Sequence, residues 1–441
     1  MNDSRKNWRR WEPLSGAWVD VRWPLAGLVA LMVAGCEKPY TWDGSLAHLL
    51  ESRPAQFGTI LEDPARYRVQ IRYTQVDRNA NNQPSFRSFE YRVDPGEYFY
   101  PASTVKLPTA VVALEKLNAL GIDGLDRDTE MRVDDEEAGK SIGRYVREVL
   151  LVSDNVAFNR LYDFVGQETL NRSLQKKGLE GTRIMHRLEI AMSVEDNRRT
   201  GPVRFVDGDT VVFEQDAAYS ATDYTAPEPI PLGKAEIVGG ERLERPKDFA
   251  TKNAYPIRAQ HDVIKALMFP DAVAEHMRFD LTNDDYAFLY RNMSGYPGES
   301  GIPEYGDADR YPEGYVKFFM YGGDAPDVPD NIRIFNKVGD AYGFLTDAAY
   351  IVDFDNGVEF ILAATIFTNA NQTFNDDTYE YDEIARLADG VADLRAHPDD
   401  GANLLGGERR MPHPKRELVV VENHRVELFV RLACLWRHHS L

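Results

Sequence analysis

The chain has 441 residues, of which 43% are hydrophobic and 11% aromatic, and its formal net charge is −20. This length and composition suit one large domain or two ordinary ones with a true core, and they exclude a disordered chain. An acidic surface without a basic, aromatic-rich patch repels phosphate backbones, so we expect no nucleic acid as a partner. Two cysteines, Cys36 and Cys434, provide no disulfide framework.

The first 36 residues have the features of an export signal. Basic residues at 5–10 precede an apolar run at 24–35, which ends in small residues directly before Cys36. Twelve residues are too few to span a bilayer comfortably but suit the apolar region of a signal peptide. We therefore expect residues 1–36 to be a lipoprotein signal peptide, with Cys36 lipidated and anchoring the chain to the membrane of the cell envelope, as a periplasmic or outer-membrane lipoprotein. An uncleaved anchor, or an ordinary signal peptide with an incidental cysteine, is the alternative.

The next elements are predicted from periodicity. Residues 37–65 are expected to form a linker that leads into a short helix at 46–50. Alternation of apolar and polar residues at 67–73 predicts a half-buried strand, and a second strand follows at 86–93 after a polar turn. Apolar residues at helical spacing from 105 to 117 then predict a helix that begins near Ala102 or Ser103 and is buried on one side.

The middle of the chain is predicted to be mostly helical. A helix over 141–152 stops at Ser153-Asp154-Asn155, whose side chains favour a break, and a further helix runs over 156–165. The range 195–256 is rich in proline and turn residues, so we interpret it as an inserted subdomain or a long lid. Helical spacing returns at 259–268.

The last third of the chain predicts strands again. Residues 332–337, 348–354 and 358–368 are expected to be strands, with a hairpin turn at 355–357, and a helix is expected over 382–396. The order of elements predicts an α+β fold with an antiparallel five-stranded sheet built from both chain ends and an inserted helical region. Residues 397–441 turn basic and are interpreted as an extension of unknown role.

The residues with clear chemistry begin with Ser103 and Lys106. A serine hydroxyl is a weak nucleophile and needs a neighbouring base, and residues three apart share one face of a helix. Backbone N–H groups at the helix start would face developing negative charge. A lysine base must be neutral, which burial or a neighbouring cation can bring about. The same spacing recurs in Ser173 and Lys176, so the spacing alone does not identify a site.

Three motifs together resemble a known family. They are Ser103-x-x-Lys106, the helix break Ser153-Asp154-Asn155, and Lys337-Val338-Gly339 at a strand end. This combination resembles the penicillin-recognising serine hydrolases and, within them, the class A β-lactamases. The resemblance covers about residues 65–396, including Tyr342, Gly343 and Asp347, and it implies a serine hydrolase domain over 66–396 with an insertion at about 195–256.

The resemblance implies a role for each matching residue. Ser103 would form the acyl-enzyme and Lys106 would accept or relay its proton, while Ser153 would protonate the leaving nitrogen beside the positive charge of Lys337. Asn155 would hold Lys106 and the substrate amide. The backbone N–H groups of Ser103 and Asp340, next to Gly339, would form the oxyanion hole, and Asp154 would be structural.

Two departures from the family are visible. Val338 replaces the hydroxyl residue that binds a substrate carboxylate in the family, which places recognition of penicillin-like or D-alanyl carboxylates in doubt. Glu189 falls at the family's separation from Ser153 and is the candidate deacylation base, or else a solvated carboxylate, while Ser193 stands where the family has asparagine. His186 is a weaker candidate for a triad base and is expected to be a packing or surface residue.

These residues predict a serine hydrolase that cleaves an amide, either a β-lactam or a peptide-like bond, through an acyl-enzyme. A D-Ala-D-Ala-type peptidase or an esterase of the same fold is an alternative, with a small molecule or a peptide as substrate. A catalytically silent lipoprotein that binds peptides or peptidoglycan is another, and a glycan-binding module rests only on Tyr305, Tyr311 and Tyr315. No metal or other cofactor is expected, because the histidines form no ligand set and no phosphate loop occurs.

Overall fold

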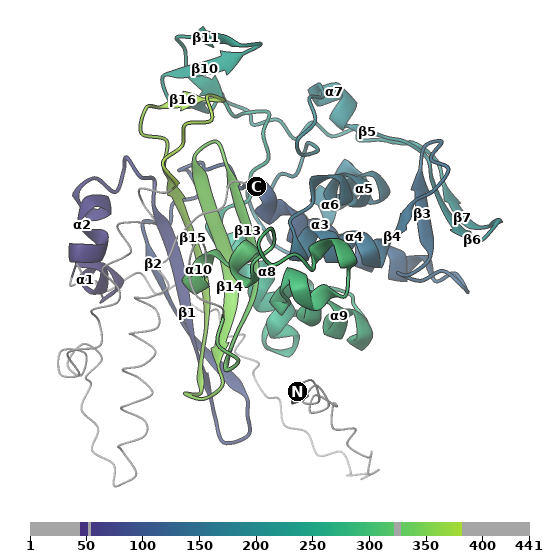
Figure 1. Ribbon diagram of the computed structural model, residues 1–441, viewed down its shortest axis with the longest axis horizontal. Helices are drawn as coiled ribbons and strands as arrows, with labels where there is room; N and C mark the ends of the chain where they lie inside the picture. The colour runs from purple at the N-terminus through teal and green to yellow at the C-terminus, as the bar shows by residue number, and fades with distance from the viewer. Residues whose placement is uncertain (1–44, 52–53, 322–327, 382–441) are drawn as a thin grey trace, which may run out of the picture. The chain divides into compact units, whose positions relative to one another are not determined.

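The computed structural model describes residues 45–51, 54–321 and 328–381. Its centre is a five-stranded antiparallel sheet with the strand order β13-β14-β15-β1-β2 (Figure 1). The strands are β13 (Ile332–Ala341), β14 (Phe344–Asp353), β15 (Val358–Phe367), β1 (Gln70–Arg78) and β2 (Pro84–Tyr91). The sheet is built from both chain ends, as predicted, and the fold class is confirmed. Cys36, the helix predicted at 382–396 and the basic extension lie outside the described residues.

The strands differ from their predicted bounds where turn chemistry was not recognised. β13 and β14 continue to a two-residue connection, Tyr342 and Gly343, with φ values of 55° and 79°. Positive φ at both positions is typical of the hairpin turn that matches strand twist, but tyrosine rarely adopts it. β1 is buried on both faces and not half-buried, because Val76 joins the apolar cluster on one face of the sheet and Ile71 and Tyr73 join the cluster on the other.

One face of the sheet carries the helical region. Helix α8 (Ile257–Met268) packs on β1, β14 and β15, and α9 (Asn283–Ser294) packs on β13. Helix α3 (Lys106–Leu120) is buried almost all round and not on one side as predicted, because it crosses the core of the helical region. It ends at Gly121, whose φ of 59° provides the left-handed cap. The neighbouring helices are α4 (Ile142–Leu151), α5 (Asn155–Val165) and α6 (Gln167–Lys176).

The opposite face is covered by the chain before and after the helical region. Helices α1 (Ser45–Glu51) and α2 (Pro54–Glu62) lie on this side of the sheet (Figure 1). Leu46, Leu50 and Phe57 from these helices join an apolar cluster with the sheet and with α10 (Phe318–Tyr321). The second helix was not predicted. It begins at Pro54, and proline is well tolerated at a first helical position.

The range 195–256 is made of short elements that pair with other parts of the chain. β6 (Val203–Asp207) and β7 (Thr210–Gln215) extend a sheet with β3 (Glu130–Val133) and β4 (Lys140–Ser141). β10 (Ala235–Val238) pairs with β11 (Glu241–Leu243) and, in parallel, with β16 (Thr373–Phe374). The remaining short elements are α7 (Val194–Asn197) and the paired strands β5 (Arg199–Thr200) with β8 (Ala218–Tyr219) and β9 (Pro231–Leu232) with β12 (Lys247–Asp248). Within the described ranges, no helix has the length and apolar character needed to cross a membrane.

Candidate active site

Ser103 lies in a single 3-10 turn, Ala102–Val105, directly before α3. Phe99 and Tyr100 are buried and anchor the approach to this turn, and Ala102 has a strained φ of 47°. Ser103 is partly exposed, whereas the other three residues of the turn are buried. The fold therefore holds this hydroxyl at the N-terminal end of a buried helix, where a reactant can reach it, and backbone strain of this kind is concentrated at functional sites.

Lys106 is the first residue of α3 and is fully buried. Its Nζ donates to the backbone oxygen of Ser153 and lies 3.2 Å from Ser153 Oγ. Burial, and then the positive charge of Lys337, holds the pKa of Lys106 well below the usual value of a lysine. The amine therefore loses its proton more readily than that of an ordinary lysine, as a general base requires.

Ser153 lies between two lysine amines. Lys337, on β13, donates from Nζ to Ser153 Oγ at 2.8 Å and to the backbone oxygen of Val338 at 2.9 Å. Burial lowers the pKa of Lys337 to about 7. Ser153 adopts a φ of 58° in the break between α4 and α5, while the carboxylate of Asp154 accepts from Ala157 N–H at 2.7 Å and caps α5. Asp154 therefore has a structural contact, and the hydroxyl of Ser153 is the group on which both amines converge.

Gly339 brings β13 against the turn that carries Ser103. A Cβ atom at Gly339 would lie 2.7 Å from both the backbone oxygen of Pro101 and the backbone nitrogen of Ser103. Only glycine permits this approach, since real Cβ atoms do not come so close to backbone atoms. Asp340 follows, and its negative charge raises the pKa of both Lys106 and Lys337. The oxyanion hole predicted from Ser103 and Asp340 stays a prediction.

Glu189 is brought to the same site by its contact with Asn155. Asn155 Nδ2 donates to Glu189 Oε2 at 2.7 Å. The residue before Glu189 is held in place, because Leu188 exchanges two hydrogen bonds with the Asn159 side chain, at 2.9 and 3.0 Å. Glu189 itself is exposed and has a φ of 63°. In the described residues Asn155 thus contacts Glu189, and the contact expected between Asn155 and Lys106 is replaced by that of Lys106 with Ser153.

Comparison with known proteins agrees with this geometry. The model of the beta-lactamase enzyme family matches residues 66–225. This segment is β-lactamase-like. It contains Ser103, Lys106, Ser153, Asn155 and Glu189, and the family resemblance predicted from the three motifs is confirmed. A comparison with curated proteins gave no match.

Several solved structures are similar to this chain at low identity. A β-lactamase from Burkholderia phymatum is 16% identical with a TM-score of 0.44, covering 78% of this chain and 98% of that one. The protein described as PBP-A is 15% identical with a TM-score of 0.43, covering 75% and 89%. A β-lactamase from Sphaerobacter thermophilus is 12% identical with a TM-score of 0.40, covering 74% and 88%. These likenesses are remote, so the site is assigned from its own contacts.

Other candidate residues of the β-lactamase-like domain have packing contacts. The His186 ring stacks on Tyr100, with centroids 6.2 Å apart, and Nδ1 donates to the Arg187 backbone oxygen at 2.6 Å. Burial lowers the pKa of His186 to about 4. Ser193 caps α7 by accepting from Asp196 N–H at 3.0 Å. Neither residue is held toward Ser103 by these contacts.

The second serine and lysine pair lies on the surface of α6. Ser173 contacts Glu115 at 3.4 Å, and Lys176 is exposed. Tyr305, Tyr311 and Tyr315 pack edge to face against one another, which agrees with a packing role. Among the described residues, no group of three histidine, cysteine or acidic side chains could hold a metal ion.

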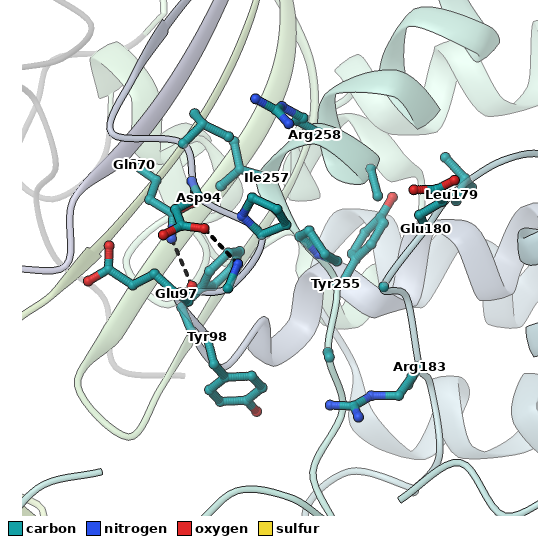
Figure 2. A pocket seen from close by; sticks show the side chains of 18 of the residues that line it. Gln70, Asp94, Glu97, Tyr98, Leu179, Glu180, Arg183, Tyr255, Ile257 and Arg258 are labelled. Carbon is teal, nitrogen blue, oxygen red and sulfur yellow. Dashed lines mark hydrogen bonds between the residues drawn. The ribbon is translucent and has the colours of Figure 1, made fainter. Parts of the chain in front are cut away.

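A cavity of about 660 Å³ lies away from Ser103. Figure 2 shows it between the segment that follows β2, the 178–183 loop and the start of α8, with Asp94, Glu97 and Tyr98 on one side and Arg183 on the other. Its lining includes none of the predicted site residues. The charged side chains around it have both signs, and they do not indicate one class of ligand.

Sequence reasoning missed one part of the site, the buried Lys317. It is fully buried on the far side of β13 from Ser103, together with Asn336 and Asp347. Asp347 was noticed only as part of the family pattern, and no motif or spacing marks Lys317. To predict the burial of Lys317 from the sequence, one would have to know which residues of β13 face away from Ser103.

Proposed function

We propose that the chain is a β-lactamase-like serine hydrolase that opens an amide through an acyl-enzyme on Ser103. One observation carries this proposal, the convergence of Lys106 and Lys337 on the Ser153 hydroxyl beside the turn of Ser103. A buried serine shared by two buried amines provides both a proton acceptor and a proton donor. A purely structural role does not explain why two fully buried lysines face one hydroxyl, because each carries a large desolvation cost.

In the acylation step, neutral Lys106 accepts the Ser103 proton as Oγ attacks the substrate carbonyl. The new C–O bond gives a tetrahedral intermediate whose oxyanion is stabilised by backbone N–H groups at the helix start. The C–N bond then breaks, and Ser153 donates its proton to the leaving nitrogen. The proton held by Lys106 returns to Ser153 along their 3.2 Å contact, so that the two residues end the step as they began it.

In the deacylation step, Glu189 is the proposed base. It would accept a proton from water as the water oxygen attacks the ester carbonyl, and the proton would return to Ser103 as the C–O bond breaks. The contact with Asn155 fixes the carboxylate near the site. Its exposure leaves room for water, but it also means that turnover depends on how the substrate closes the site.

The substrate class follows from Val338. This side chain is fully buried in the apolar cluster on the far face of β13, so it offers nothing to a substrate carboxylate. We therefore propose that the substrate is an amide or ester whose recognition does not depend on a hydroxyl at this position. β-Lactams and peptidoglycan stem peptides remain the two amide classes to test.

The test compares three reagents on residues 37–441 and on the Ser103→Ala variant. A fluorescent penicillin, a chromogenic cephalosporin and a fluorophosphonate report acylation by a β-lactam, its turnover and general serine reactivity. We expect labelling by at least one reagent, abolished by Ser103→Ala. Stable penicillin labelling without cephalosporin turnover would identify a penicillin-binding behaviour, and labelling by none of the three would refute the proposal.

We also propose that the chain is exported and anchored in the cell envelope through a lipid on Cys36. The basic, apolar and small-residue order before Cys36 supports this. Metabolic labelling with a radioactive fatty acid should mark the wild-type chain and not Cys36→Ser. Equal labelling of both, or none of either, would contradict lipidation at Cys36.

A further inference from the structure

A cluster of buried polar side chains lies behind β13, on the face away from Ser103. Side chains alternate along a strand. Lys337 therefore points to the helical side, where it meets Ser153, and the backbone of Gly339 faces the turn of Ser103 on the same side. Asn336 and Val338 point to the other side. Asp347 lies directly across from Val338 on β14, and it therefore shares that far face.

Lys317 joins this cluster from the segment before α10. Its side chain is fully buried, and Nζ donates to the Met293 backbone oxygen at 2.6 Å and to Asn336 Oδ1 at 2.9 Å. Both acceptors are neutral oxygens. The cation therefore has no direct carboxylate ligand in these contacts, and its charge acts on the carboxylate one step further along the chain of hydrogen bonds.

That carboxylate is Asp347, which is also fully buried. Asn336 Nδ2 donates to its two oxygens at 3.0 and 3.1 Å, and Phe319 N–H donates to Oδ2 at 3.2 Å. Burial raises the pKa of Asp347 to about 6, whereas these hydrogen bonds and the charges of Lys317 and Lys337 act in the opposite direction. The ionised form thus depends on its neighbours.

We propose that Lys317 is a positioning residue that keeps Asp347 ionised behind β13 and thereby keeps Lys337 cationic where it meets Ser153. The catalytic consequence rests on the proposed function, but the effect on Asp347 does not. The chain of contacts runs from Lys317 through Asn336 to Asp347. Asp347 then attracts Lys337, which lies on the other face of β13, through its charge and not through a hydrogen bond.

The sign of this effect depends on two opposing actions of Lys317. It repels Lys337 directly, and it stabilises the carboxylate that attracts Lys337. The attraction from Asp347 is the larger influence on Lys337, so losing the carboxylate outweighs losing the repulsion. Other charges also act on these groups. Asp340 attracts Lys337, and Lys106 and Lys337 repel each other. Glu299 and Arg333 act on Lys317.

The first experiment reads the carboxylate directly and needs no activity. Carbon-13 aspartate labelling follows the Asp347 carboxyl during a pH titration, with the signal assigned by its loss in Asp347→Asn. In Lys317→Met, whose side chain has similar length without charge, the midpoint should rise by about one pH unit. Lys116→Met, at a half-buried lysine elsewhere, should leave it unchanged. An unchanged midpoint in folded Lys317→Met overturns the proposal.

The second experiment is a double-mutant cycle on acylation of Ser103. Lys317→Met should slow labelling about tenfold in the wild-type background and less than twofold in Asp347→Asn, because the two changes act through one carboxylate. Lys317→Arg should retain most of the rate. Equal slowing in both backgrounds would indicate a merely structural role and would overturn the catalytic part. If even the wild type fails to label, the proposed function fails, while the titration still decides the role of Lys317.

Discussion

The hydroxyl of Ser153 lies within hydrogen-bond distance of two buried lysine amines, those of Lys106 and Lys337. Two ammonium groups next to one hydroxyl repel each other, and both lysines are buried, so the pair is more stable with one amine neutral. Burial and the repulsion from Lys337 lower the pKa of Lys106, while Asp347 and Asp340 oppose the effect of burial on Lys337. In the proposed mechanism, these charges favour Lys106 as the neutral base and Lys337 as the cation beside the leaving group.

The two serine and lysine pairs of the chain provide a matched test of Lys106. Lys106→Met should slow acylation of Ser103 by about 10²- to 10⁴-fold, which is the usual contribution of a general base. Lys176→Met removes the lysine with the same spacing, which is exposed on α6, and should leave the rate unchanged. Labelling rates with the fluorophosphonate, measured beside thermal melting, check the result. Equal rates for Lys106→Met and Lys176→Met would exclude Lys106 as the base.

Residue types were predictable here, but their partners were not. The spacing of Ser103 and Lys106 and the break at Ser153 follow from local rules for helix starts and ends. The pairing of Asn155 with Glu189 depends on how the 187–192 loop folds back, which is a tertiary contact without a local signal. Lys317 was invisible for the same reason, because its burial depends on a strand that follows it in the chain.

At the scale of elements, the edge strand β13 meets the 3-10 turn before α3 at Gly339. Gly339→Ala would place a methyl group 2.7 Å from the backbone of Pro101 and Ser103, so strand and turn must separate. We expect a loss of stability of about 1–3 kcal/mol and a strong loss of acylation. Gly298→Ala, where a Cβ meets nothing within 4 Å, is the control for adding a methyl group. Urea unfolding and labelling measure both effects, and wild-type acylation by Gly339→Ala would show that the close approach is dispensable.

Strand alternation also decides what Val338 can do. Because Val338 lies in an apolar cluster on the far face of β13, restoring a hydroxyl with Val338→Thr should not create a contact with substrate. The buried hydroxyl should instead cost about 1–3 kcal/mol of stability. Penicillin acylation rates of wild type and Val338→Thr should therefore agree, apart from the unfolded fraction. A gain of tenfold or more would mean that this side chain turns toward the substrate.

Elements with strong periodicity were predictable, and those held by tertiary contacts were not. The hairpin of β14 and β15 was found from its Asn-Gly turn, and the helix after Ser103 from its apolar spacing. The connection at Tyr342 was missed because a tyrosine with positive φ violates local preference. The strand pairs of 195–256 are as short as two residues, and such elements carry no periodic signal.

At the scale of the whole molecule, the chain combines a strongly acidic composition with buried lysines. Lys106, Lys317 and Lys337 are each at most 2% exposed. Burial lowers the pKa of Lys317 and Lys337 to about 7, against 10.5 for an ordinary lysine. Burying these lysines on folding costs free energy while they are charged, and this cost falls as they lose their protons. The free energy of unfolding should therefore depend on pH at neutral and alkaline pH.

The sign of that dependence follows from proton counts. Between about pH 7 and 10 the unfolded chain keeps its lysines protonated while the folded chain has released protons, so the unfolded state binds more. The free energy of unfolding should therefore rise with pH over this window, by up to about 1.4 kcal/mol per pH unit for each such lysine. Above pH 10 the trend reverses, because burial raises the pKa of tyrosines such as Tyr290, and the folded chain then binds more protons than the unfolded one.

Urea unfolding at intervals of one pH unit measures the slope, and Lys317→Met supplies the matched comparison. Lys317→Met lacks one of the buried lysines that release a proton on folding, so its free energy of unfolding should rise less between pH 7 and 10 than that of the wild type. Lys176→Met, at an exposed lysine, should keep the wild-type slope. A stability that falls steadily over this window, or equal slopes in wild type and Lys317→Met, would show that the buried lysines remain charged in the folded protein.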